Sequence, residues 1–208
     1  MSLTIKEEKK EYKLIPEGLY EAKCISVVDL GEQETEYQGV TKYKNQVLLE
    51  WEIPEIVIEY EKDGEKKKFN QIVRKTYTAN LGEKSNLRKD LNSWRGKAFT
   101  EEELKAFNLK NILGKDCNIQ IIHETKNDKT WNIINVLPVG KTHTPIAVEN
   151  ELKSFDFDVD DLKKIADFPE WLQEKITNSM TFQKMIDSTD GSQVDSDLTG
   201  EDIDEIPF

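Results

Sequence analysis

The residues with the clearest chemical potential are cations interleaved with aromatic rings between residues 71 and 100. This stretch holds seven basic residues, namely Arg74, Lys75, Lys84, Arg88, Lys89, Arg95 and Lys97, against two acidic ones. Proteins that bind single nucleic-acid strands without sequence preference combine such cations with rings on which bases stack, at about 1 to 3 kcal/mol per base. The stretch therefore predicts a phosphate-contacting surface, and the alternative is an ordinary solvated face.

Tyr77 and Trp131 are two candidates for base stacking. Tyr77 shares a strand face with Lys75. Trp131 shares a face with Ile133, but the opposite face of its strand is apolar as well, so the sequence leaves open which face is buried. We expect the phosphates to be contacted by Arg74, Lys75, Arg88, Lys89 and Arg95.

A third candidate is Tyr43, which stands between Lys42 and Lys44 and forms the clearest lysine–aromatic–lysine unit of the chain. We expect this unit to contact nucleic acid as well. Three further lysines, residues 66–68, follow an Asp63–Gly64 turn. An ordinary solubilising hairpin is the alternative explanation for those three.

Catalytic and metal-binding patterns do not stand out. The chain has no glycine-rich phosphate loop, no GxSxG motif and no CxxC or HExxH spacing. His123 and His143 are too few for a histidine-based metal site. We therefore expect a protein that is not an enzyme and that needs no cofactor or metal, with a nuclease kept as an alternative.

Charge is distributed unevenly along the 208 residues, whose formal net charge is -12. Residues 1–150 carry 24 Lys and Arg against 25 Asp and Glu, whereas residues 151–208 carry 5 against 16. A locally basic body joined to an acidic tail predicts two partners of opposite character. No run of 18 apolar residues and no secretory signal are present, so we expect a cytoplasmic protein with Cys24 and Cys117 as reduced, buried thiols.

Five strands and a helical insertion are expected from the periodicity. Alternating or β-rich runs predict strands over 18–31, 46–60, 66–79, 114–124 and 129–139, and a polar stretch over 31–45 predicts a loop. Ser85 and Gly96 bound a helical pattern, and Thr100 starts a second short helix. Trp51 and Trp94 lie on apolar faces and are expected in the core.

The predicted fold class is mainly β with helical insertions. The order β-β-β-α-β-β is the layout of a five-stranded OB-fold barrel, with helices between strands three and four; a generic α+β domain fits the same order. In OB-folds the loop after the first strand often meets nucleic acid, which fits the unit at 42–44.

The expected organisation has four parts along the chain. They are a flexible N-terminal arm over 1–15, the OB-fold domain over 16–140, a linker with an amphipathic C-terminal helix over 141–186, and a disordered acidic tail over 187–208.

The last seven residues, DIDEIPF (202–208), resemble the acidic tip of bacterial single-stranded DNA-binding proteins, which ends in aspartates followed by Ile-Pro-Phe. Four further segments resemble a group of phage replication-module proteins. They are PEGLYEAKC, NLRKDLNSWRGKAFTEEEL, NILGKDCNIQIIH and FPEWLQEKI, between residues 16 and 186. The resemblance implies an OB-fold single-strand binder of bacteriophage replication and recombination. The tetrameric state common among bacterial binders does not transfer, because of the helical insertion and the additional C-terminal helix.

The resemblance also implies a role for the tip. The Phe208 ring would enter an apolar pocket of a replication or repair enzyme, while carboxylates attract a basic rim and Pro207 limits the conformations lost on docking. The residues expected to bind the partner are Asp202, Asp204, Glu205, Ile206, Pro207 and Phe208.

We therefore expect a sequence-tolerant single-stranded DNA-binding protein that coats exposed strands and recruits partner enzymes through its tail. No membrane partner is expected, and a homo-oligomer remains open. The alternatives are an acidic protein-interaction adaptor or DNA mimic, a strand-annealing recombination accessory, and a phage nuclease.

Overall fold

The computed structural model describes residues 14–37, 39–62 and 65–190. The chain divides into two compact units. The first unit comprises Met1–Val28 and Leu48–Ser154, and the second comprises Asp29–Val47 and Phe155–Phe208. The boundary expected at residue 140 thus falls inside the first unit.

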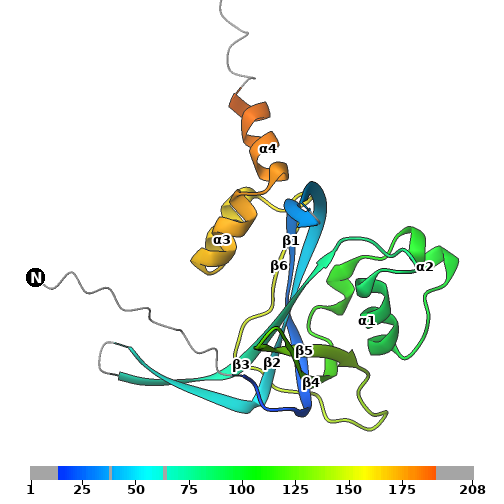
Figure 1. Ribbon diagram of the computed structural model, residues 1–208, viewed down its shortest axis with the longest axis vertical. Coiled ribbons are helices and arrows are strands. Elements are labelled where there is room, and N and C mark those ends of the chain that lie inside the picture. Colours follow the sequence, from blue (N-terminus) through cyan, green and yellow to red (C-terminus); the bar gives the residue numbers. More distant parts are fainter. Residues whose placement is uncertain (1–13, 38, 63–64, 191–208) are drawn as a thin grey trace, which may run out of the picture. The chain divides into compact units, whose positions relative to one another are not determined.

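The chain is mainly β, with a curled antiparallel sheet of five long strands. The strands are β1 (Gly18–Tyr37), β2 (Val40–Lys62), β3 (Glu65–Thr78), β4 (Asp116–Lys126) and β5 (Lys129–Leu137), and their spatial order is β3-β2-β1-β4-β5 (Figure 1). A short strand, β6 (Lys153–Phe155), also pairs with β1. The predicted order of elements, with helices between the third and fourth strands, is confirmed.

The helical insertion has the predicted ends. Helix α1 (Asn86–Arg95) is capped by the Ser85 hydroxyl, which accepts from the Arg88 amide, and it ends at Gly96 with φ of 65°. Helix α2 (Glu101–Lys105) begins with a capping box between Thr100 and Glu103. A 3-10 turn, η1 (Leu109–Ile112), leads back to the sheet.

The inner face of the sheet in the first unit forms an apolar core. The strands supply fully buried side chains at alternating positions, including Ala22, Cys24, Trp51, Cys117, Ile119 and Ile121. Trp51 meets the buried Trp94 of α1 edge to face, with ring centroids 6.1 Å apart. The prediction of two buried, unpaired thiols is confirmed, as is the core position of both tryptophans.

Helix α1 packs against β5 and β3, the strands at the two ends of the sheet. The buried residues Leu87, Leu91 and Trp94 form its apolar stripe. In addition, the Trp94 indole donates to the backbone carbonyl of Asp116 at 2.9 Å. The helix therefore contributes to the same core as the sheet.

Residues 138–152 form a segment without helix or strand, which we call the strap. Two sheet carboxylates hold it, and the first is Glu52 of β2, which is fully buried. It accepts from the backbone amides of Glu149 and Asn150 at 2.8 and 3.0 Å and from the side-chain amides of Asn150 and Asn70 at 2.7 and 2.6 Å. Burial alone would raise the pKa of Glu52, but these four donors hold its pKa below the ordinary value.

The second anchor is Asp116, the first residue of β4. One carboxylate oxygen lies 3.1 Å from the Lys23 ammonium, and the other accepts from the Ile146 amide at 3.3 Å and lies 3.1 Å from Nε2 of His143. Burial would raise the pKa of Asp116, and these neighbours lower it on balance. The segment predicted as a linker is thus fastened to the sheet by one buried and one half-buried carboxylate.

The second unit contains the far ends of β1 and β2 together with η2 (Leu162–Asp167), α3 (Glu170–Thr177) and α4 (Met180–Asp190). Its core is aromatic and aliphatic and includes Leu30, Phe155, Phe157, Phe168, Leu172 and Ile176. Gly31 has φ of 67°, and a β-carbon there would meet Phe157, Ser179 and Thr181 below 3.0 Å. Glycine is therefore required where β1 passes these side chains.

Two predictions are wrong in this second unit. The stretch 31–45 does not form a loop; it continues β1 and β2 as a hairpin whose turn includes Gly39, with φ of 73°. Its polar sequence gives no period because most of its side chains are exposed or half-buried on both faces. The single C-terminal helix is instead two helices, α3 and α4, separated at residues 178–179.

No helix within the described ranges is both long and apolar enough to cross a membrane.

The strap anchor gives the first prediction. We expect Glu52→Ala to lower the free energy of unfolding by about 3 kcal/mol at neutral pH, because buried donors lose a charged acceptor. Glu55→Ala removes an exposed carboxylate from the same strand and should change it by less than about 0.5 kcal/mol. Urea unfolding measures both values, and equal effects would contradict the assignment.

The pH dependence of stability provides a second check on the same anchor. Because the pKa of Glu52 is lower in the folded protein, its stabilisation is present above the ordinary glutamate pKa of about 4.3 and is lost as the pH falls through the folded value. The difference in stability between the wild type and Glu52→Ala should therefore shrink in acid.

Candidate functional site

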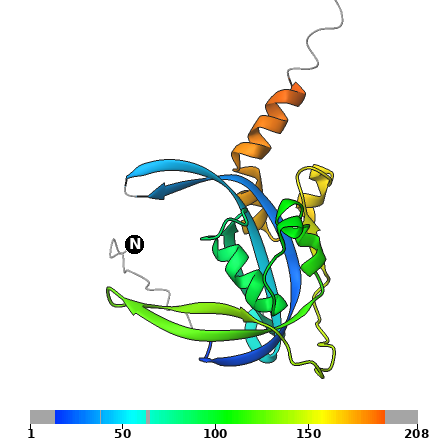
Figure 2. The same ribbon diagram turned by 90° about the vertical axis from the view of Figure 1, so that its right-hand side faces the viewer.

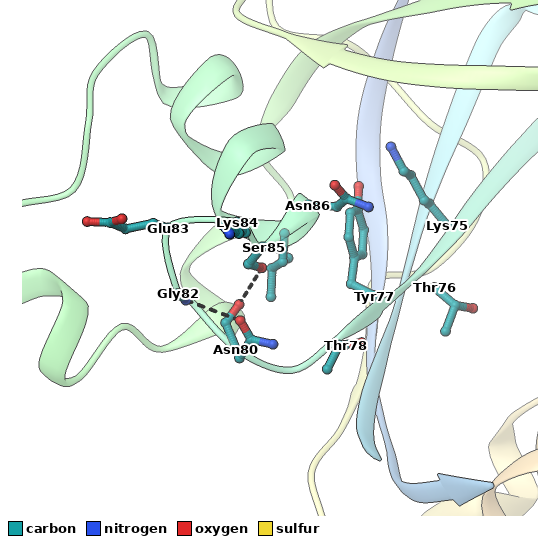
Figure 3. A pocket seen from close by; sticks show the side chains of 11 residues that line it. Lys75, Thr76, Tyr77, Thr78, Asn80, Gly82, Glu83, Lys84, Ser85 and Asn86 are labelled. Carbon is teal, nitrogen blue, oxygen red and sulfur yellow. Dashed lines mark hydrogen bonds between the residues drawn. The ribbon is translucent and has the colours of Figure 1, made fainter. Parts of the chain in front are cut away.

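A polar groove of about 660 Å³ lies in the first unit between the end of β3 and the start of α1. Its walls are residues 75–78 of β3, the turn residues Asn80 and Gly82, and residues 83–87. The turn is held by its own bonds, since the Asn80 carboxamide accepts from the Gly82 amide at 3.1 Å and the Ser85 hydroxyl donates to the Asn80 carbonyl at 2.7 Å (Figure 3).

The groove lining suits a polar, anionic ligand. Lys84 contributes an exposed ammonium group, and Thr76 and Thr78 contribute hydroxyls from an exposed face of β3. Figure 3 shows that Glu83, the acidic residue of the lining, points away from Lys75. The helix that begins here has no acidic residue in its first turn. Lys84 was in the predicted basic stretch but not among the residues expected to contact phosphate.

Tyr77 and Lys75 are held by one carboxylate. Asp90 of α1 accepts from the Tyr77 hydroxyl and from the Lys75 ammonium, both at 2.7 Å, and the same ammonium donates to the Ile134 carbonyl of β5 at 2.9 Å. Tyr77 is only 3% exposed. Burial, followed by the neighbouring Asp90 carboxylate, raises the pKa of its hydroxyl well above the usual range.

The prediction that Tyr77 is a stacking platform is therefore wrong, because a base has no access to its ring face. The sequence pattern was ambiguous, because alternation placed Tyr77 and Lys75 on one face of the strand without showing whether that face is buried. Lys75 faces the same interior, and its ammonium is already shared between Asp90 and a carbonyl. Its role is to join β3, α1 and β5.

Arg95 is also a structural cation. Its guanidinium pairs with Glu103 and lies over the rings of Phe99 and Phe107, 4.2 and 5.5 Å from their centroids, and its side chain is 16% exposed. The expected phosphate contact at Arg95 is therefore contradicted, because the charge is enclosed within the helical insertion. In contrast, the side chains of Trp131 and Lys89 are exposed to solvent.

The remaining predicted cations of the stretch differ in exposure. Arg74 donates to Glu50 at 2.9 Å, and its side chain remains 47% exposed. Arg88 is half-buried and donates to the Leu81 carbonyl at 3.2 Å. Lys89 is exposed on α1. Of the five expected phosphate contacts, Lys89 and Arg74 thus have the most exposed side chains.

The hairpin of β4 and β5 presents a second surface, and Figure 2 shows it reaching out past α1. Its turn residues Asn127 and Asp128 have φ of 51° and 58°, as a two-residue hairpin turn requires. Glu124 lies opposite Trp131, and Lys126 lies opposite Lys129. Because alternate residues share a face, these four side chains lie on one face of the hairpin.

The same face continues toward the body of the sheet through Ile122, which lies opposite Ile133. Ile122 is 41% exposed and Trp131 is 37% exposed, whereas Ile121 on the opposite face is fully buried. We call this set the outer hairpin face: Ile122, Glu124, Lys126, Lys129, Trp131 and Ile133. The open question about Trp131 is thus answered, since its side of β5 faces solvent.

The two lysines of the outer hairpin face are exposed, and neither forms an ion pair within the described part of the chain. Like charges placed directly opposite each other destabilise a strand pair, and an anion bound between them removes that cost. An exposed indole lies one position further along the same face. Lys126 and Lys129 were not among the predicted site residues, although a two-residue turn at Asn127 and Asp128 places them opposite each other.

The unit Lys42, Tyr43 and Lys44 lies on β2 in the second unit, and all three side chains are exposed. The Tyr43 ring is 48% exposed, and its hydroxyl lies 3.5 Å from a Glu34 carboxylate oxygen. Because these residues are on a strand and not in a loop, Tyr43 projects from the face opposite the two lysines. The arrangement does not form one cation–ring–cation cluster.

The six residues expected to bind a partner, 202–208 without Ile203, lie outside the described residues. Within the described ranges, no cluster of three or more His, Cys, Asp or Glu side chains is placed to hold a metal ion. In comparisons with known proteins, the chain matches no protein-family model and no curated protein.

The shared carboxylate of Asp90 gives a further prediction. We expect Asp90→Ala to lower the free energy of unfolding by about 3 kcal/mol, because a buried hydroxyl and a lysine lose their common acceptor. The exposed neighbour substitution Lys89→Ala should change stability by less than about 0.5 kcal/mol. Thermal and urea unfolding test the pair, and a stable Asp90→Ala variant would contradict the structural role of Lys75 and Tyr77.

Proposed function

We propose that this protein is a non-enzymatic, sequence-tolerant single-stranded DNA-binding protein of a phage replication or recombination module. The observation that carries the proposal is the outer hairpin face, where Lys126 and Lys129 lie opposite each other next to the exposed ring of Trp131. Cations that meet phosphates beside a ring that stacks on bases are the combination used by sequence-tolerant single-strand binders.

The sheet order supports the proposal at the level of the fold. A path β3-β2-β1-β4-β5, with the helix between β3 and β4, is the connectivity of an OB-fold barrel in which β3 and β5 would close the ring. Here α1 packs against both of those strands. Because the same fold serves many functions, the assignment of function depends on the surface residues and not on the barrel.

The polar groove offers a second binding place for single-stranded DNA. Lys84 and the hydroxyls of Thr76 and Thr78 suit a phosphodiester, and Lys89 adds an exposed cation on the same helix. Contacts of this kind are sequence-independent and depend on salt. The acidic tail then recruits replication or recombination enzymes, as its resemblance to bacterial single-strand binders implies.

Titration of intrinsic tryptophan fluorescence with oligo-dT tests the proposal. We expect saturable quenching that weakens with salt and is much smaller with duplex DNA. Trp131→Leu should remove most of the quenching and weaken binding about tenfold, because one stacked base contributes about 1 to 3 kcal/mol. Absence of binding by the wild type at low salt, confirmed by a gel-shift assay, would overturn the proposal.

The paired lysines predict a change in salt dependence. We expect the double variant Lys126→Ala/Lys129→Ala to reduce the slope of log K against log salt by about 1.4, since each phosphate contact on a single strand contributes about 0.7. Lys163→Ala, which removes an exposed lysine of the second unit, is the matched control and should leave the slope near that of the wild type.

The Glu124 carboxylate on the outer hairpin face predicts the opposite effect, namely that its removal strengthens DNA binding. Glu124 lies opposite Trp131 and repels a phosphate bound near the indole. We therefore expect Glu124→Gln to tighten oligo-dT binding severalfold at low salt, with the gain disappearing at high salt. Glu101→Gln on α2, an exposed carboxylate, should have no such effect, and weaker binding by Glu124→Gln would exclude this face from the site.

A further inference from the structure

The hairpin of β2 and β3 continues as a two-stranded arm that leads away from α1 (Figure 1). The arm comprises residues 55–60 and 65–69, and each of its side chains is exposed or half-buried. It contributes none of the fully buried core residues. Its apolar residues therefore have no evident role in the stability of the first unit.

Two rings of the arm form an exposed aromatic pair. Tyr60 and Phe69 are 42% and 37% exposed, and they meet edge to face with centroids 5.3 Å apart. Val57 on the same arm is 52% exposed, on the face of β2 opposite Tyr60. An edge-to-face pair fixes both rings and leaves their outward faces available. Large exposed apolar side chains gathered on one hairpin mark a binding surface.

The arm carries three lysines and three carboxylates, Glu55, Glu59 and Glu65, but the lysines lie together on one strand. Lys66, Lys67 and Lys68 follow one another on β3, which stands at the end of the sheet. Lys68 pairs with Glu59 at 2.7 Å, whereas Lys66 and Lys67 form no ion pair with a described residue. Pairing of two copies through this edge would bring the lysine runs together, so their repulsion disfavours a second copy and favours a polyanion.

We infer that the β2–β3 arm is a second nucleic-acid contact, in which Tyr60 and Phe69 stack on bases while Lys67, which shares the β3 face of Phe69, neutralises a phosphate. This inference rests on the proposed function and extends it. The arm then lengthens the stretch of single strand that one molecule covers. A short oligonucleotide occupies the outer hairpin face without reaching the arm, whereas a long one engages both.

The experiment compares oligo-dT of about 8 nucleotides, a length within the usual range for one OB-fold site, with oligo-dT of about 30 nucleotides, a length above that range. We expect the double variant Tyr60→Ala/Phe69→Ala to bind the long strand about tenfold more weakly and the short strand as the wild type does. Tyr60→Phe should bind both like the wild type, because stacking needs the ring and not the hydroxyl. Lys67→Ala should reduce the salt slope for the long strand alone, whereas Lys66→Ala, on the opposite face of β3, should leave it near that of the wild type.

The controls separate the outcomes. Leu152→Ala removes an exposed apolar side chain of the strap, 49% exposed, and should not change binding of either strand. Wild-type affinity of the arm variants for the long strand would overturn the inference and leave the proposed function intact. Failure of the wild type to bind either strand would overturn both. Conversion of a wild-type dimer to a monomer by Tyr60→Ala/Phe69→Ala, measured by sedimentation, would assign the arm to self-association instead.

Discussion

The shared hydrogen bonds of Lys75 are the interaction on which the first unit depends. The curled sheet ends in β3 on one side and β5 on the other, and α1 packs against both. The Lys75 ammonium reaches the Asp90 carboxylate of the helix and a backbone carbonyl of β5. The two side chains are partly buried, and their shared hydrogen bonds fix the position of the helix relative to both strands.

This constraint explains why part of the predicted basic stretch serves the fold. Lys75 and Arg95 neutralise carboxylates at the helical insertion, and the ring of Tyr77 is enclosed with them. Charges whose geometry is fixed inside a packed element cannot also adapt to a ligand. The cations left for a polyanion are those on strand ends and helix surfaces, where solvent surrounds the ammonium group.

The strap follows the same physical rule with carboxylates in place of lysines. It has no regular backbone pairing, yet Glu52 and Asp116 give its amides acceptors inside the unit. A segment with few apolar residues is thereby ordered by charge-assisted hydrogen bonds. Two outward surfaces of the first unit, the outer hairpin face and the β2–β3 arm, combine exposed rings with lysines.

The sequence by itself determined the order of the elements, because alternation, helical spacing and the caps at Ser85, Gly96 and Thr100 are local properties. It also placed Trp51 and Trp94 in the core, since each lies on an apolar face. It did not find the strand character of 31–45, where exposed residues on both faces remove the period. Only the tertiary structure decided between Tyr77 and Trp131, because burial depends on what packs against each face. The pairing of Lys126 with Lys129 follows from the two-residue turn between them, whereas the exposure of their face, together with Trp131, depends on what packs against the sheet.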